Sequence, residues 1–156
     1  MSIVYLGIGS NIGDKQANCE HAVHRLNSID GMKVAVMSTF YRTKPVGGPP
    51  QEDYINGVVG VKTGFSPQEC LCACKQIETD LERKKSAKDH PRIIDIDILL
   101  YEDVILRTND LTIPHPRMHE RYFVLRGFSE IAPDAVHPAL GKTILELYEE
   151  VSEPVR

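Results

Sequence analysis

The chain has 156 residues, of which 42% are hydrophobic, and its formal net charge is −4. A chain of this length can fold as one domain that buries roughly two thirds of its unfolded surface without disulfide bonds. The acidic balance excludes general nucleic-acid affinity, which needs a sustained basic face, and no apolar run is long enough to span a membrane. We therefore expect one domain over residues 1–156 and, because the start of the chain lacks a signal-peptide pattern, a cytoplasmic location.

The first half of the chain predicts a strand, a helix and two more strands. Residues 3 to 8 have the pattern of a strand, and Asp14 can cap the helix that follows. That helix places apolar side chains on one face, namely Cys19, Ala22, Val23 and Leu26. Further strands are expected from Met32 to about Tyr41 and from Tyr54 to Thr63, as antiparallel neighbours.

The next element is a helix with a well-defined start. Ser66 can cap it, Pro67 suits its first position, and Glu69 completes a capping box. Its apolar side carries Cys70, Cys74, Ile77 and Leu81. An acidic strand within residues 91–100 follows, so the order of elements is β-α-β-β-α-β. This order predicts an α+β fold with a ferredoxin-like core, one sheet backed by helices.

Three further elements extend this core. A short strand is expected near Val104 to Leu106, and a helix from about Arg121 to Ile131. A last helix begins at Thr143, which can form a capping box with Glu146.

The segment Pro91–Leu100 is the most informative part of the sequence, because two aspartates interrupt a β-branched run. Alternate side chains of a strand share a face, so Asp95 and Asp97 point one way and the opposite face carries Ile94, Ile96 and Ile98. At roughly 6.5 Å and an effective dielectric near 20, two such charges repel by about 2.5 kcal/mol. A cation offsets this cost, and Mg²⁺ suits the pair because it binds one or two carboxylates together with waters and substrate phosphates. The other interpretation is a half-exposed strand with an acidic outer face.

A basic segment directly precedes this strand. Residues 83–92 carry five Lys or Arg side chains against one carboxylate. A solvated helix end would explain the cations alone, since cations are favoured at helix C-termini. Beside the acidic strand, they instead suit a polyphosphate with bound metal, which needs both signs of charge. This segment and residues 42–53 are also long enough to serve as lids over a site.

The cysteines and histidines lack the spacing of a zinc site. His21 and His24 lie one helical turn apart, but a structural zinc site needs four ligands, so both are interpreted as surface residues. Reduced thiols, buried or half-buried, are expected at Cys19, Cys70, Cys72 and Cys74.

Six motifs follow one another along residues 3 to about 148. They are Gly9-Ser10-Asn11, Phe40–Pro45, Asp53–Asn56, Ile77-Glu78 with Arg83, Pro91–Asp97, and Ile113–Pro116 with Arg121 and Phe123. In this order, the set resembles the 6-hydroxymethyl-7,8-dihydropterin pyrophosphokinase family.

The resemblance implies an enzyme of folate biosynthesis. ATP would give its β,γ-pyrophosphoryl group to the hydroxymethyl oxygen of the pterin and leave as AMP. It also implies that Asp95 and Asp97 hold two Mg²⁺ ions, which neutralise the polyphosphate and align the attacking and leaving groups.

The resemblance further implies roles for individual residues. Arg83 and Arg92 would grip the phosphates of ATP as lid arginines and form the catalytic group with Asp95 and Asp97. The other ATP contacts would be Glu78, Lys85, Ile98, Leu111, Thr112, His115 and Arg121. The pterin would be bound by the backbone of Thr43, Lys44, Pro45 and Val46, by the stacking rings of Tyr54 and Phe123, and by the polar side chain of Asn56.

Two departures from the family pattern fall in the basic segment. Asp89 and His90 stand where relatives often carry a Trp and a small residue, and the segment from Glu78 to Arg92 is one residue shorter. Lys85 therefore matches a lid arginine with a point charge instead of a planar fork. We expect a lid that seals ATP less tightly.

Two other functions fit parts of the pattern. One is another two-metal nucleotide enzyme on a ferredoxin-like core, such as a cyclase or polymerase palm, and the other is a regulatory module that binds nucleotide without turnover. The first of these does not need Asn56 and Phe123 around a pterin. We expect a monomer whose partners are ATP and the pterin, with neither nucleic acid nor membrane among them.

Overall fold

The computed structural model describes residues 1–44, 53–82 and 93–151. The basic segment 83–92 and most of the loop 42–53, both interpreted as lids, lie outside the described residues. So do five residues with implied roles, which are Pro45, Val46, Arg83, Lys85 and Arg92.

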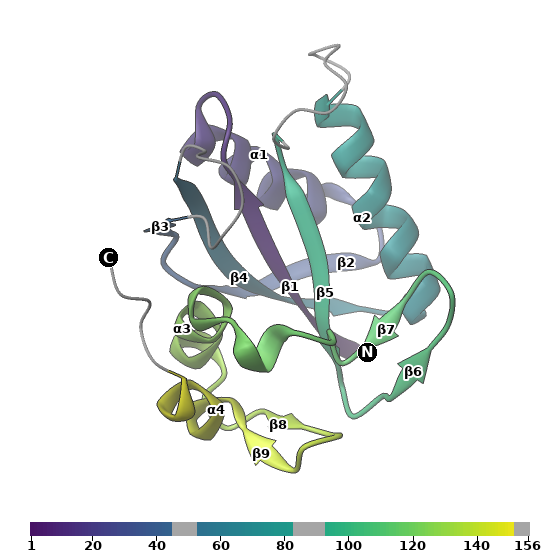
Figure 1. The fold of residues 1–156 in the computed structure, drawn as a ribbon. Coiled ribbons are helices and arrows are strands. Elements are labelled where there is room, and N and C mark those ends of the chain that lie inside the picture. The colour runs from purple at the N-terminus through teal and green to yellow at the C-terminus, as the bar shows by residue number, and fades with distance from the viewer. Residues whose placement is uncertain (45–52, 83–92, 152–156) are drawn as a thin grey trace.

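An antiparallel sheet forms the centre of the molecule (Figure 1). Its strands are β1 (Ser2–Ser10), β2 (Met32–Met37), β3 (Tyr41–Thr43), β4 (Tyr54–Thr63) and β5 (Asp95–Tyr101). Four of them lie in the order β2-β4-β1-β5, and β3 pairs with β4 beyond the end of β2. The predicted α+β, ferredoxin-like core is confirmed.

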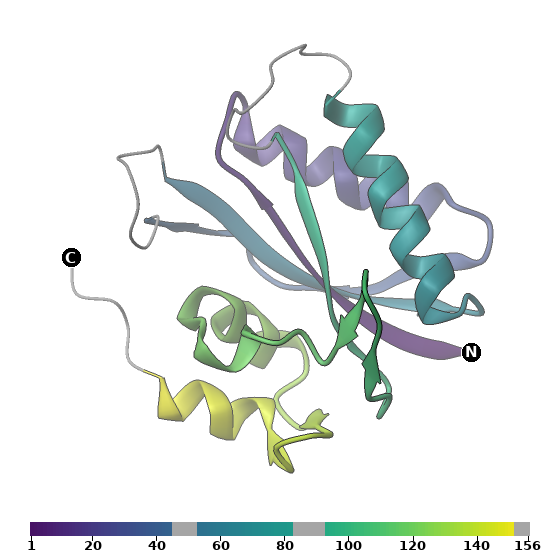
Figure 2. The same ribbon diagram turned by 45° about the vertical axis from the view of Figure 1, so that its right-hand side comes forward.

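Helices cover both faces of the sheet (Figure 2). On one face lie α1 (Lys15–Ser28) and α2 (Pro67–Glu82), and on the other lie α3 (Tyr122–Ile131) and α4 (Ile144–Glu150). Short elements complete the chain: β6 (Leu106–Arg107) pairs with β7 (Thr112–Ile113), β8 (Val136–His137) pairs with β9 (Lys142–Thr143), and the 3-10 turn η1 (Met118–Glu120) precedes α3. Among the described residues, no helix is both long and apolar enough to cross a membrane.

The predicted helix starts form as expected. Asp14 accepts a hydrogen bond from the first turn of α1 at 3.1 Å. Before α2, Ser66 and Glu69 bond each other's backbone N–H at 2.9 and 3.2 Å, and Thr143 and Glu146 do the same before α4 at 2.9 and 3.1 Å. These contacts lie within four residues of each other, which is why the sequence alone locates them.

The single strand predicted from Met32 to Tyr41 is wrong, because the chain bends between β2 and β3. At the bend, the N–H of Ser38 donates to the carbonyl of Val58, and the Ser38 hydroxyl accepts from Val58 N, both at 2.9 Å. Ser38 is buried, so these bonds replace its contacts with water. The bend depends on a strand twenty residues away, which local sequence patterns do not report.

Two apolar cores lie on opposite faces of the sheet. The core under α1 and α2 takes alternate residues of the central strands, among them Val4, Leu6, Ile8, Ile94, Ile96 and Ile98. The core under α3 and α4 includes Leu99, Leu100, Leu125, Phe128 and Ile144. The pairing of β1 with β5 shifts register between Tyr5 and Leu6, so both leucines at 99 and 100 join the second core.

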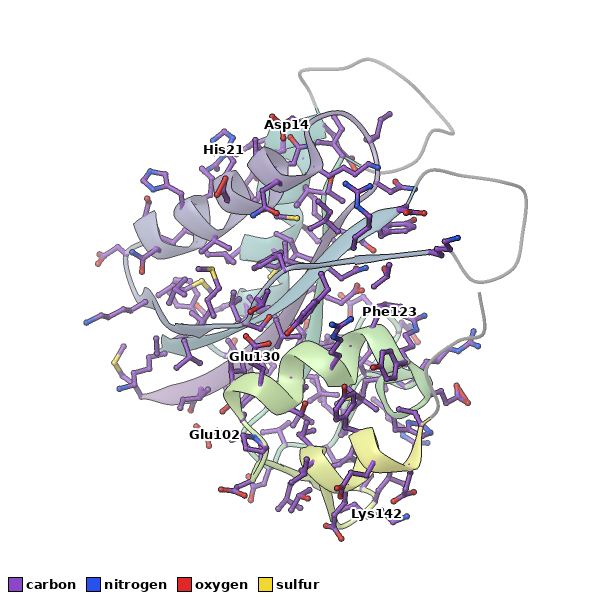
Figure 3. All side chains as sticks on the ribbon, turned by 90° about the vertical axis from the view of Figure 1, so that its left-hand side faces the viewer. Asp14, His21, Glu102, Phe123, Glu130 and Lys142 are labelled. Carbon is purple, nitrogen blue, oxygen red and sulfur yellow. The ribbon has the colours of Figure 1, made fainter. Side chains whose placement is uncertain are left out.

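The cysteines and surface histidines lie mostly where expected. Cys19, Cys70 and Cys74 are free and buried, and burial raises the pKa of Cys19 to about 12, so its thiol stays protonated. Cys72 is exposed on α2, which contradicts the expectation that it is at least half-buried. His21 lies exposed on the outer side of α1 (Figure 3).

Candidate active site

The acidic pair projects from β5 onto the sheet face that carries α3. Asp95 pairs with Gly9 of β1 and Asp97 with Gly7, whereas Ile96 and Ile98 belong to the core on the opposite face. The shared face predicted for the two aspartates is therefore confirmed. Because the two facing residues of β1 are glycines, β1 itself places no side chain beside the carboxylates.

A cavity of about 520 Å³ opens above this part of the sheet. Its floor comes from β1, β4 and β5. One wall comes from the end of β3, and the other from the segment that leads into α3 and from the first turn of α3. It brings together nine residues predicted from the sequence: Thr43, Lys44, Tyr54, Asn56, Asp95, Asp97, His115, Arg121 and Phe123. Positions as far as 80 residues apart in the chain, Thr43 and Phe123, thus meet in one space.

Four predicted ATP contacts lie outside this lining, although the structure describes them: Glu78, Ile98, Leu111 and Thr112. The Glu78 side chain belongs to α2, is 3% exposed, and accepts a hydrogen bond from Ile96 N at 2.8 Å. Lys75 lies 3.4 Å from the same carboxylate. Burial raises the pKa of Glu78. The charge of its carboxylate, which lies on the α2 side of β5, in turn helps to raise the pKa of Asp97.

The electrostatics of the floor favour a bound cation. Burial, then the charges of Asp95 and Glu78, raise the pKa of Asp97 to about 6, against an opposing effect of Arg121. Among the described residues, no group of three or more His, Cys, Asp or Glu side chains gathers into an all-protein cage. Two carboxylates facing a cavity fit an ion that takes its remaining ligands from water and substrate phosphate, as Mg²⁺ does.

The wall opposite the aspartates is cationic. Arg121 caps the start of α3, where its carbonyl accepts hydrogen bonds from Val124 N and Leu125 N, both at 3.1 Å. His115 is held by two backbone contacts: its N–H donates to Leu99 O at 2.9 Å, and its Nδ1 accepts from Arg117 N at 3.2 Å. Since Nδ1 accepts, the neutral ring carries its proton on Nε2.

The charge of His115 follows from the same surroundings. Burial, then the nearby Arg121, lower the pKa of His115, and Asp95 acts in the opposite direction. A neutral imidazole can still donate one hydrogen bond to an anionic oxygen through Nε2.

Arg117 and Glu120 also line the cavity, although neither was predicted from the sequence. Arg117 Nε lies 3.5 Å from Glu120 Oε2, and the side chains are 69% and 56% exposed. The signal that could have indicated Arg117 is its place directly after the motif Ile113–Pro116, two residues after His115. It adds a third cation or donor to the wall.

The far side of the cavity is suited to a flat, polar ring. Tyr54 on β4 and Phe123 on α3 contribute aromatic side chains, and Phe123 lies near the start of α3 (Figure 3). Asn56 donates from Nδ2 to Thr43 Oγ1 at 2.6 Å. Aromatic faces and an amide in one cavity can bind a heterocycle that both donates and accepts hydrogen bonds.

Paired carboxylates on a sheet with cationic side chains opposite them are an arrangement suited to a metal-bound polyphosphate, as in enzymes that transfer phosphoryl groups. The family model described as 7,8-dihydro-6-hydroxymethylpterin-pyrophosphokinase (HPPK) matches residues 5–133. The chain belongs to this family and is, by family, a pyrophosphokinase of folate synthesis.

Proteins with similar sequences support this assignment. A Synechocystis 2-amino-4-hydroxy-6-hydroxymethyldihydropteridine pyrophosphokinase is 43% identical over 94% of this chain and 74% of its own length. The Aquifex aeolicus protein of the same name is 39% identical over 94% of this chain and 90% of its own. The Schizosaccharomyces pombe folic acid synthesis protein fol1 is 43% identical over 87% of this chain, which spans only 19% of that longer protein.

A solved structure confirms the fold. Plasmodium falciparum HPPK-DHPS with pteroate superposes with a TM-score of 0.78 at 18% identity, over 96% of this chain and 42% of that one. The present chain therefore spans less than half of that structure.

Proposed function

We propose that this chain transfers the β,γ-pyrophosphoryl group of ATP to the hydroxymethyl group of 6-hydroxymethyl-7,8-dihydropterin and releases AMP. The observation that carries the proposal is that one cavity contains both a charged group of side chains and an aromatic group with an amide. Asp95 and Asp97 face His115 and Arg121 there, beside Tyr54, Asn56 and Phe123. A metal-bound triphosphate suits the first group, and a flat, amide-edged ring suits the second.

In the proposed reaction, a bond forms between the hydroxymethyl oxygen and the β-phosphorus. The bond from that phosphorus to the oxygen bridging the α-phosphate breaks, AMP leaves, and the hydroxyl proton is released. Asp95 and Asp97 would hold two Mg²⁺ ions, which supply neutralising charge to the triphosphate when bound. Positioning and electrostatic stabilisation then account for most of the rate.

The remaining residues bind and orient the two substrates. His115 donates from Nε2 to a phosphate oxygen, and Arg121 offers its planar fork to the same chain of phosphates. Arg83, Lys85 and Arg92, outside the described residues, are proposed as lid cations. The contacts proposed for the rest of ATP are Glu78, Ile98, Leu111 and Thr112. The backbone of Thr43, Lys44, Pro45 and Val46 is proposed to contact the pterin.

The reaction itself is tested by mixing the protein with Mg²⁺, ATP and the hydroxymethyl-dihydropterin, and separating the nucleotides by chromatography. We expect AMP in a one-to-one ratio with pyrophosphorylated pterin, no AMP without pterin, and no turnover in excess EDTA. A cyclic nucleotide would favour a different two-metal enzyme. Saturable nucleotide binding without turnover would favour a regulatory module.

The role of the aspartates is tested by Asp97→Asn, which keeps the size of the side chain and removes its charge. We expect turnover to fall by about a thousandfold or more, because the metal charge that stabilises the transition state is lost. Asp103→Asn is the matched control, since Asp103 is exposed and lies outside the cavity lining. Turnover of folded Asp97→Asn close to that of the control would contradict the metal site.

We further propose a single-domain monomer that acts in the cytoplasm. ATP is an intracellular co-substrate, and the four cysteines are free, as is typical of a reducing compartment. Size-exclusion chromatography with light scattering should give a mass near 17.5 kDa for this chain. A mass of twice that value would contradict the monomer.

A further inference from the structure

The carboxamide of Asn56 is held by neighbours on both sides. Asn56 lies on β4 between β3 and β1, and the register pairs Tyr41 with Asn56 and Thr43 with Tyr54. Thr43 and Asn56 are therefore diagonal neighbours on one face of the sheet, the face that lines the cavity. Their side chains bond directly, with Asn56 Nδ2 donating to Thr43 Oγ1 at 2.6 Å.

Gly9 provides the space on the other side of the same amide. It pairs directly with Asn56 across β1 and β4. A Cβ atom at residue 9 would lie 2.6 Å from Asn56 Oδ1, which is closer than carbon and oxygen approach without displacement. The amide oxygen thus occupies the space above a glycine backbone, while the amide nitrogen is tied to Thr43.

These two contacts determine what Asn56 offers to a ligand. One Nδ2 hydrogen is used by Thr43, which leaves Oδ1 as an acceptor and the second Nδ2 hydrogen as a donor. A ligand edge that carries an N–H next to a C=O can satisfy both atoms. An edge with acceptors alone leaves Oδ1 without a donor, which costs binding energy in a partly buried site.

We propose that Thr43 is a positioning residue whose hydroxyl fixes the Asn56 amide for recognition of an amide-type ligand edge, and so sets substrate specificity. This inference rests on the proposed function, because the pterin is the ligand that presents such an edge. This role is distinct from the backbone contact to the pterin that the family resemblance implies for Thr43, because it depends on the side-chain hydroxyl. It also differs from a purely structural pair, which would stabilise β3 against β4 without affecting substrate choice.

The experiment compares Thr43→Val, which keeps the shape and removes the hydroxyl, with Thr43→Ser, which keeps the hydroxyl. The steady-state constants are measured for ATP, for the hydroxymethyl-dihydropterin, and for its analogue O-methylated at the ring amide, which has no N–H at that edge. Thr79→Val is the matched control, because Thr79 is exposed on α2 and lies outside the cavity lining. Thermal unfolding of each variant is recorded in parallel.

For Thr43→Val, we expect KM for the pterin to rise about five- to twentyfold, with kcat within about twofold and KM for ATP unchanged. The preference for the pterin over the methylated analogue should shrink by at least about fivefold, because the amide is no longer held in one orientation. Thr43→Ser should restore both values, and Thr79→Val should match the unmodified protein.

The inference is overturned if Thr43→Val lowers only the unfolding temperature and keeps the pterin KM and the preference. It is also overturned if Thr43→Ser is as impaired as Thr43→Val, since the hydroxyl is then not the cause. Should Thr43→Val fail to fold, Thr43→Ala replaces it in the same comparison. If the unmodified protein releases no AMP with pterin, the proposed function fails, and pterin binding measured by its fluorescence still decides the role of Thr43.

Discussion

At the scale of single residues, the site combines charges that repel one another when no ligand is bound. Asp97 shows this most clearly, because burial and its neighbours raise its pKa from 3.8 to about 6. The ionised form is therefore less favourable in the folded chain than in the unfolded one, and it destabilises the metal-free protein at neutral pH. Such a cost is common at functional sites, where a ligand offsets it.

We accordingly predict that Asp97→Asn stabilises the metal-free protein while it abolishes turnover. The gain should reach at most about 3 kcal/mol above pH 6, and it should disappear as the pH falls toward the unfolded pKa, where Asp97 is protonated in both states. Urea unfolding in EDTA over this pH range measures the effect. Equal stability of Asp97→Asn and the Asp103→Asn control at high pH would contradict the raised pKa.

A second prediction at this scale concerns Arg117, which pairs with Glu120 at the edge of the cavity. Arg117→Gln should weaken binding of MgATP by about three- to tenfold, a modest effect because the side chain is exposed and screened. Glu120→Gln should strengthen it slightly, since it frees the guanidinium for phosphate.

Calorimetric titration with MgATP measures both changes. Lys62→Gln, an exposed cation on β4 outside the cavity lining, controls for net charge. Equal affinity for Arg117→Gln and this control would exclude Arg117 from the phosphate site.

At the scale of elements, the contact between β3 and α3 joins two walls of the cavity. Glu130 near the end of α3 accepts hydrogen bonds from Thr39 N at 2.6 Å and from the Thr39 hydroxyl at 2.7 Å (Figure 3). Arg126 of the same helix stacks 3.7 Å above the ring of Tyr41 on β3. One helix thereby holds Phe123 at its start and steadies the strand of Thr43 near its end.

We predict that Glu130→Ala destabilises the fold by about 1 kcal/mol, through the loss of hydrogen bonds to a charged acceptor at an exposed site. The hydrogen bonds from Tyr41 and Thr39 lower the pKa of Glu130, so this stability is present above the ordinary carboxyl pKa and is lost as the pH falls through the lowered one. Urea unfolding at neutral and acidic pH measures it. Glu149→Ala on α4 is the control, and an equal effect at both pH values would contradict the carboxylate's role.

The elements also show how far the sequence predicts this structure. The starts of α1, α2 and α4 follow from caps that lie within one turn, and the alternation around Asp95 and Asp97 follows from strand geometry. The bend at Ser38 was missed because its hydrogen-bond partner is on another strand.

The candidate site was also predictable only where local sequence patterns indicate it. Motifs located nine of the cavity residues, since each lies in a short recognisable pattern. They did not separate Glu78, which packs behind β5, from residues that face the cavity, because which side of the strand a helix residue reaches is a tertiary property. Arg117 was missed for want of a pattern that distinguishes a bound cation from a solvated one.

At the scale of the whole molecule, one sheet separates a core beneath α1 and α2 from a smaller core beneath α3 and α4. The cavity lies on the second side, beyond the point where α3 begins. The strands that form its floor pack against the core beneath α1 and α2 on their other face. This packing keeps the two aspartates in place while a ligand enters from the cavity side.

A ligand that joins these parts should stabilise all of them. We predict that ATP with Mg²⁺ raises the unfolding free energy by about 2.7 kcal/mol at a hundredfold excess over its dissociation constant. ATP with EDTA should have far less effect, and Asp97→Asn should show little response to Mg²⁺. Thermal unfolding with each addition measures this, and an equal shift with and without the metal would contradict a shared metal and nucleotide site.

The carboxylate of Glu78 has one more consequence. β5 is the last strand of the sheet, and the N–H of Ile96 points to the side where no further strand pairs within the described residues. A bare row of such groups is a template onto which another polypeptide can add, which can lead to aggregation. By accepting from this donor, the buried carboxylate of Glu78 removes one edge group beside the acidic pair from pairing with another chain.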